Sequence, residues 1–164
     1  MTSVGPARTQ RPDVVLRPME AGEEHAAAGV HLDARSWAVE TGMMPPPAHP
    51  RSDAGRWFTH DVAPHREVWV AEADERLVGV LVLDAAFVDQ LCVLPAYAGR
   101  GIGSALLQLA TALRPDGFGL WVFEVNARAR RLYERCGLVP VERGDGSGND
   151  EGAPDVRYAW HPGD

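Results

Sequence analysis

The sequence has few cysteines and no long apolar segment. Cys92 and Cys136 are its two cysteines, too few for a disulfide framework, so a reducing, cytoplasmic setting is expected. It contains no run of about 18 apolar residues, so we expect no membrane-spanning helix. Residues 1–12 lack the apolar core of a signal peptide. We expect them to form a flexible tail ahead of a single domain over residues 13–164.

Basic charge is also scarce in this chain. Lys and Arg number 16 against 23 Asp and Glu, which gives a formal net charge of −7. Non-specific nucleic-acid binding depends on basic surface that displaces counterions, so nucleic acid is not an expected partner. A cationic partner, such as an amine, is compatible with the acidic balance. The six histidines show no metal-ligand spacing, and no metal is assigned.

The sequence does contain a regular series of strand and helix patterns. Three strand patterns with short connections lie between residues 67 and 93 and predict an antiparallel meander. Helical spacing of apolar residues alternates with further strands after that point. This order predicts an α/β fold in which helices pack on one mixed sheet. The expected strands are 14–18, 67–73, 77–83, 87–93, 118–125, 138–141 and 156–160, and the expected helices are 21–40, 102–114 and 126–136.

A glycine-rich turn connects the strand at 87–93 to the helix at 102–114. Gly99, Gly101 and Gly103 occupy alternate positions in it, and the absence of a Cβ lets the backbone turn tightly and approach a ligand closely. The free N–H groups of the first helical turn and the helix dipole both favour an anion there. The turn therefore predicts a phosphate or pyrophosphate site. A glycine turn without a ligand is the alternative.

Two groups of residues resemble the GNAT superfamily of N-acetyltransferases. The first resembles the acyl-coenzyme A pyrophosphate loop of that family, and the second resembles its helix that carries Asn and Tyr. The resemblance implies a central, mostly antiparallel sheet that is splayed between its fourth and fifth strands and flanked by helices. The groups are Val93-Leu94-Pro95 with Gly99-Arg100-Gly101-Ile102-Gly103-Ser104, and Asn126 with Ala129, Leu132-Tyr133-Glu134 and Cys136-Gly137-Leu138.

The resemblance implies that acetyl-CoA is the cosubstrate. A bulge near residues 91–93 would aim a backbone N–H at the acyl carbonyl, where it would steady the developing oxyanion. The loop of the family usually begins with Gln or Arg where this chain has Ala98, so one side-chain contact to phosphate is missing while the backbone cradle survives. The expected cofactor-binding residues are Leu91, Cys92, Val93, Ala98, Gly99, Arg100, Gly101, Ile102, Gly103, Ser104, Asn126 and Tyr133.

Two residues are candidates for proton transfer. Tyr133 matches the tyrosine that protonates the leaving thiolate in this family, and a core tyrosine is the alternative reading. Many relatives carry Glu where Phe87 stands. Strand alternation places Phe87, Asp89, Leu91 and Val93 on one face, which makes Asp89 the nearest carboxylate able to act as a base, directly or through a water. A capping or ion-paired aspartate is the alternative there.

The resemblance implies transfer of an acetyl group to a primary amine by direct attack in a ternary complex. The acceptor would be a small molecule or a peptide, bound by residues 30–60 and 144–154. A homodimer is common in the family and is a further expectation. A non-catalytic acyl-CoA-binding module of the same fold is the main alternative. A dinucleotide-binding fold fits poorly, because Ser104 stands where its third glycine belongs and an antiparallel meander precedes the turn.

Overall fold

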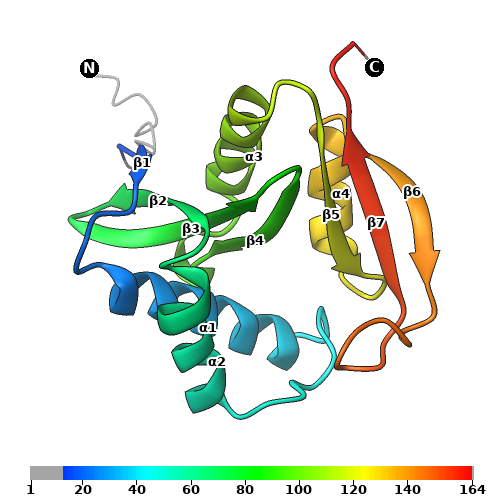
Figure 1. Ribbon diagram of the computed structural model, residues 1–164, viewed down its shortest axis with the longest axis horizontal. Helices are drawn as coiled ribbons and strands as arrows, with labels where there is room; N and C mark the ends of the chain where they lie inside the picture. The colour runs from blue at the N-terminus through cyan, green and yellow to red at the C-terminus, as the bar shows by residue number, and fades with distance from the viewer. Residues whose placement is uncertain (1–12, 164) are drawn as a thin grey trace, which may run out of the picture.

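The structure is a computed structural model that describes residues 13–163, so the expected tail at residues 1–12 lies outside the described residues. Its seven strands form one mixed sheet in the order β1-β2-β3-β4-β5-β7-β6, and only the β4–β5 pair is parallel (Figure 1). The mixed α/β sheet predicted from the sequence is confirmed. The strands are β1 Val15–Pro18, β2 Glu67–Ala73, β3 Arg76–Asp84, β4 Phe87–Val93, β5 Phe118–Phe123, β6 Val139–Gly144 and β7 Asp155–Trp160.

The β2–β4 meander forms because β-branched and leucine side chains fill one continuous interior. Val70, Val80 and Val82 are fully buried, and each lies in a strand hydrogen-bonded to its antiparallel neighbour. Asp74 and Glu75 connect β2 to β3, and both have positive φ angles of 51° and 60°. Positive φ at two central residues is the geometry of a tight hairpin turn whose twist matches the flanking strands. The predicted antiparallel meander is confirmed.

Four helices cover the sheet (Figure 1). Helix α1 (Glu24–Glu40) contacts β3 and β4 and is one continuous helix. Helix α2 (Arg51–Trp57) contacts α1 and continues into a π-helical turn at Phe58–Val62. Helix α3 (Ile102–Leu113) packs on the same strands from the opposite side, and α4 (Ala127–Arg135) packs on β7. None of the helices described is both long and apolar enough to cross a membrane.

The sheet opens between β4 and β5. These strands pair at a single position, Phe87 with Gly119, and then diverge (Figure 1). A Cβ at Gly119 would lie 3.3 Å from Phe87 Cζ, so glycine permits the close approach at this position. Beyond it, the facing edges of the two strands form no ladder with each other. The splay expected between the fourth and fifth strands is therefore present, and it divides the sheet into a β1–β4 half and a β5–β7–β6 half.

Candidate active site

The glycine-rich turn has the backbone geometry that its composition predicts. Gly99 and Gly101 adopt φ angles of +74° and +84°, in the left-handed region that favours glycine. Gly101 is the N-cap of α3 and provides no side-chain cap. Gly103 has another role, because a Cβ there would lie 3.1 Å from Leu132 Cδ2. It therefore allows α3 to pack closely on α4, which carries Tyr133.

The backbone N–H groups of residues 99–104 have no acceptor among the described residues. The Ala98 N–H donates to Pro95 O, and the Ala105 N–H donates to Gly101 O, 3.0 Å away. Between these two bonds, no N–H of residues 99–104 donates a hydrogen bond to any residue in the range 13–163. Several donors at one helix N-terminus, together with the helix dipole, form a cradle suited to an anion.

A cavity of about 300 Å³ opens beside this cradle. The turn, the end of β4, α4 and the second half of α1 line it. All the expected cofactor-binding residues line it except Arg100 and Ile102. Ile102 is the first residue of α3 and is buried in the core, while the Arg100 guanidinium carbon lies 5.2 Å above the Tyr97 ring. Neither side chain therefore faces the cavity.

A second cavity of about 220 Å³ lies in the opening between β4 and β5. Its walls include Leu91, Cys92, Asn126 and Tyr133, which also line the first cavity. The two cavities therefore meet at these residues. Further polar residues of α1, β4, the β6–β7 loop and β7 line the second cavity: Arg35, Asp89, Gln90, Asn149 and Asp155.

Tyr133 lies at the junction of the two cavities. Its side chain is 7% exposed, and its ring centroid lies 5.8 Å from that of Tyr158. Its hydroxyl forms no hydrogen bond with any described residue, and its oxygen retains some accessible surface. The hydroxyl is therefore accessible to a ligand in the cavity. Burial raises the pKa of the phenol well above its ordinary value, which keeps the hydroxyl protonated near neutral pH.

Asn126 begins helix α4. Its Oδ1 accepts a hydrogen bond of 3.1 Å from the N–H of Ala129, as a helix N-cap does. Its Nδ2 group donates no hydrogen bond to another described residue, and Asn126 lines both cavities. One end of the amide thus fixes the helix, while the other remains available to a ligand.

The bulge in β4 lies earlier than the sequence suggested. Val82 pairs with Gln90 and Leu83 pairs with Val88, so Asp89 is the extra residue. The expected bulge near residues 91–93 is wrong, and so is strict alternation along this strand, because a bulge reverses the faces that follow it. Asp89 Oδ2 accepts a hydrogen bond of 3.0 Å from Arg66 Nε. Its carboxylate thus belongs both to an ion pair and to the wall of the second cavity.

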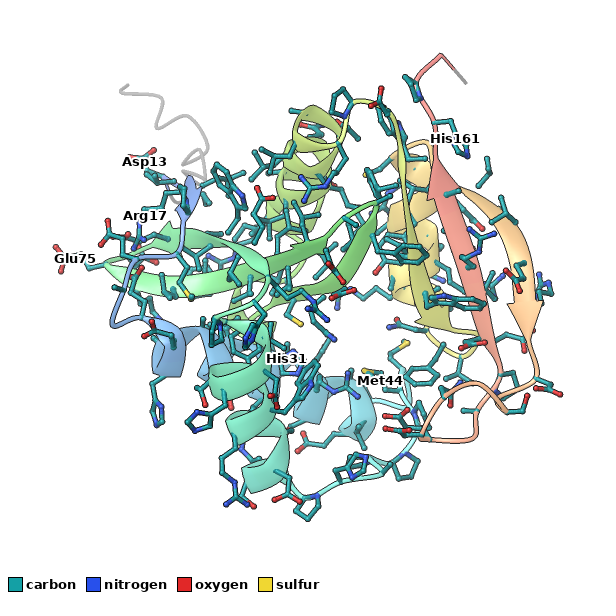
Figure 2. All side chains as sticks on the ribbon, in the orientation of Figure 1. Asp13, Arg17, His31, Met44, Glu75 and His161 are labelled. Atoms are coloured by element: carbon teal, nitrogen blue, oxygen red, sulfur yellow. The ribbon has the colours of Figure 1, made fainter. Side chains whose placement is uncertain are left out.

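A buried pair that the sequence analysis missed lies behind the cavities. Cys92 Sγ is 3.6 Å from Nδ1 of His31, which is 2% exposed. His31 is labelled in Figure 2. Burial lowers the pKa of His31 to about 4 and raises that of Cys92 to about 11, so both groups are neutral near pH 7. A neutral thiol is a weak nucleophile. The pair therefore joins α1 to β4. The sequence could have indicated the burial of His31, because it lies one helical turn after Ala27, on the same face of the helix.

Two polar contacts between side chains join distant segments at the margin of the second cavity. His49 Nε2 lies 3.1 Å from Asp150 Oδ2, and Arg35 Nη2 lies 3.5 Å from Glu151 Oε1. They connect α1 and the segment after it to the β6–β7 loop. Met44, labelled in Figure 2, belongs to that segment and lines both cavities. The segments expected to shape an acceptor site therefore lie together.

Comparison with known proteins gives a consistent result. The acetyltransferase (GNAT) domain model matches residues 64–139. Peptidyl-lysine N-acetyltransferase YjaB of Salmonella typhimurium is 33% identical over 86 residues, which make up 52% of this chain and 59% of that relative. The chain thus aligns with less than two thirds of this relative's length.

Solved structures share the fold. Apo YjaB from Escherichia coli superposes with a TM-score of 0.73 at 19% identity, over 90% of this chain and 97% of that one. The PaiA N-acetyltransferase from Thermoplasma acidophilum, solved in complex with coenzyme A, has a TM-score of 0.70 at 18% identity, over 91% of this chain and 99% of that one. These solved structures show that the chain shares the fold of GNAT acetyltransferases, and the domain model shows that residues 64–139 are similar to that family.

Proposed function

We propose that this protein transfers the acetyl group of acetyl-CoA to a primary amine, with a lysine side chain of a peptide or protein as the first acceptor to test. The observation that carries the proposal is the set of N–H groups of residues 99–104, none of which donates a hydrogen bond within residues 13–163. Four of these residues, Gly99, Gly101, Gly103 and Ser104, line the cavity that Tyr133 also lines. The peptidyl-lysine acetyltransferase name of YjaB and the coenzyme A held by PaiA support the choice of substrates.

The residues present suit this cosubstrate. Gly101 lies in the left-handed region, which an L-residue would adopt only with strain. Glycine at this position therefore preserves the turn that would direct the N–H groups at a diphosphate. Asn126 Nδ2 would bind an amide of the pantetheine arm, and the open edge of β4 at residues 91–93 would pair with that arm as a strand does. Acetyl-CoA supplies the activated thioester when bound.

In this proposal, Tyr133 donates a proton to the leaving thiolate. Its phenol is neutral near pH 7, as an ordinary tyrosine is, and burial raises its pKa further. Its hydroxyl has no competing partner among the described residues, so its proton is available at the junction of the two cavities. A positioned proton donor typically contributes about 10²- to 10⁴-fold to a rate.

The second cavity is proposed to bind the acceptor amine. The carboxylates of Asp89 and Asp155 line it from β4 and β7, and the indole of Trp121 forms part of the same wall. Carboxylates and an aromatic face both attract an ammonium group. Asp89 is the proposed base that removes the proton of the amine, directly or through a water.

The test of the enzyme itself measures release of free coenzyme A with a panel of amines that includes a lysine peptide. Tyr133→Phe should lower turnover by about 10²-fold or more and leave coenzyme A affinity unchanged, because the ring is kept and the proton is lost. Tyr158→Phe is the matched control, since its hydroxyl donates to Glu134 Oε1, 2.8 Å away, and lines neither cavity. Equal turnover in the wild type and Tyr133→Phe would remove Tyr133 from the chemistry.

The role of Asp89 is separable from its ion pair. Asp89→Asn removes the carboxylate, whereas Arg66→Ala removes only its partner 3.0 Å away. A base predicts that Asp89→Asn loses turnover, while Arg66→Ala keeps it. Equal losses in the two variants would assign Asp89 a structural role. Coenzyme A binding without release of free thiol for any amine would favour the non-catalytic module.

A further inference from the structure

We propose that Arg128, held against Trp37, provides the side-chain contact to the coenzyme A diphosphate that Ala98 cannot make. This inference rests on the proposed function and adds a binding residue from a different element. The side chain of Ala98, at the start of the glycine turn, is a methyl group and cannot bind phosphate. The residues that follow it in the turn contribute backbone N–H donors. Arg128 belongs to α4, across the first cavity from α1.

The position of Arg128 relative to the turn is the first observation. Its Nη2 atom lies 3.7 Å from the place that a Cβ would take at Gly99. Both residues line the first cavity, together with Gly101 and Ser104. The guanidinium therefore lies beside the cradle that the N–H groups of residues 99–104 form. An anion in that cradle would meet it directly.

The support beneath the guanidinium is the second observation. The Arg128 Cζ atom lies 5.2 Å from the centroid of the Trp37 ring, within the range of a cation–π contact. A guanidinium stacked on an indole keeps its N–H groups at the edge of the plane, free to form two hydrogen bonds with phosphate oxygens. Trp37 lies on α1, so it would restrain an otherwise exposed side chain before the ligand arrives.

The state of the neighbouring cations is the third observation. Within residues 13–163, Arg128 forms no ion pair, whereas Arg35 in the same cavity is paired with Glu151. Arg100 lies over Tyr97, whose hydroxyl donates to Asp74. Arg135 lines the cavity seven residues further along α4, roughly 10 Å from Arg128 by helical rise. Arg100 and Arg135 likewise form no ion pair within residues 13–163, but Arg100 does not line the first cavity. Arg128 is distinguished by lying 3.7 Å from the Cβ position at Gly99 and by its contact with Trp37.

Calorimetric titration with three ligands tests this assignment. Coenzyme A and dephospho-coenzyme A both contain the diphosphate, whereas pantetheine lacks it. Arg128→Ala should weaken binding of the first two about tenfold to a hundredfold, the usual effect of losing a hydrogen bond to a charged group. Pantetheine binding should not change. Arg131→Ala is the matched control, because Arg131 is an exposed arginine of the same helix that lines no part of the first cavity.

Two further variants separate charge from fold. Arg128→Lys keeps the charge but loses the planar fork, and it should bind coenzyme A with intermediate affinity. Arg128→Gln keeps most of the side chain without the charge and should resemble Arg128→Ala. Thermal unfolding of each variant shows that it is folded before binding is measured, and any variant that fails this check is replaced by the other neutral one.

The possible results are distinct. Unchanged coenzyme A affinity in the folded neutral variant, with the wild type binding normally, overturns the inference. A loss confined to coenzyme A, with dephospho-coenzyme A unaffected, would assign Arg128 to the 3′-phosphate and overturn the diphosphate contact. A wild-type protein that binds none of the three ligands would overturn the proposed function itself. Losses shared by the two diphosphate ligands alone support the inference.

Discussion

His31 shows how burial sets the charge of one residue. Its ring packs 5.4 Å from Phe58 and 6.1 Å from Trp57, and its Nδ1 lies 3.6 Å from the Cys92 thiol. No carboxylate pairs with it among the described residues, so the protonated ring would lose its hydration without compensation. The pKa of His31 accordingly falls to about 4.

This shift predicts a pH dependence of stability. Between pH 6.5 and pH 4 the unfolded chain binds a proton at residue 31 that the folded chain does not, so the free energy of unfolding falls as the pH falls through that window. The slope from this one residue is about 1.4 kcal/mol per pH unit at most. Urea unfolding at several pH values measures it. His31→Phe should show a shallower slope than the wild type.

The exposed His60 provides the control for that experiment. His60→Gln should keep the wild-type slope, because the His60 side chain is exposed to solvent and not packed in the core. Identical slopes for His31→Phe and the wild type would show that other groups cause the acid sensitivity.

The individual site residues differ in how far the sequence predicted them. Tyr133, Asn126 and the turn glycines follow from motif and spacing, and the structure brings them to one cavity. The bulge at Asp89 did not follow, because the sequence analysis assumed a regular strand over 87–93, and no residue there marks an insertion. Arg128 is one of three arginines near the start of α4, and only its contact with Trp37, 91 residues earlier in the chain, distinguishes it.

At the scale of elements, the turn between β4 and α3 depends on backbone angles that only glycine adopts without strain. Gly101→Ala should destabilise the protein by about 1–2 kcal/mol, because its φ of +84° forces a Cβ toward a carbonyl oxygen. No other atom lies within 4 Å of that Cβ, so strain alone causes the loss. Chemical denaturation gives the change in stability, and titration with coenzyme A should show weaker binding.

Gly29 offers the matched comparison. It lies inside α1, and a Cβ there would also meet no atom within 4 Å, but its φ is not positive. Gly29→Ala should stabilise the protein by about 0.5–1 kcal/mol, since alanine has the better helix propensity. A similar loss for both variants would mean that the turn has no special requirement for glycine.

The elements themselves were largely predictable from the sequence. Strands with short connections and an amphipathic helix after a glycine turn leave periodic patterns, and those predicted here agree with the structure within a few residues. The π-helical turn at Phe58–Val62 left no such pattern, because one additional residue in a helix is a matter of packing. The order in which β7 inserts between β5 and β6 depends likewise on contacts between distant segments.

At the scale of the molecule, the two halves of the sheet meet through one residue pair between β4 and β5. Coenzyme A bound between them should supply the missing hydrogen-bond partners along β4. We therefore expect amide hydrogen exchange at residues 90–93 to slow when coenzyme A is added, while exchange in the meander core at Val80 and Val82 changes little. Ligand at 100 times its Kd should also stabilise the fold by about 2.7 kcal/mol. Faster or unchanged exchange in β4 would contradict this binding mode.

The gap in the ladder has a consequence for the protein without its ligand. Beyond Phe87 and Gly119, strands β4 and β5 do not pair with each other, so each has an open edge in addition to the two outer edges of the sheet. Exposed edges are templates for association with strands of other chains. Light scattering should therefore record aggregation of the ligand-free protein, and added coenzyme A should prevent it. Coenzyme A in the cell would then protect the protein from self-association.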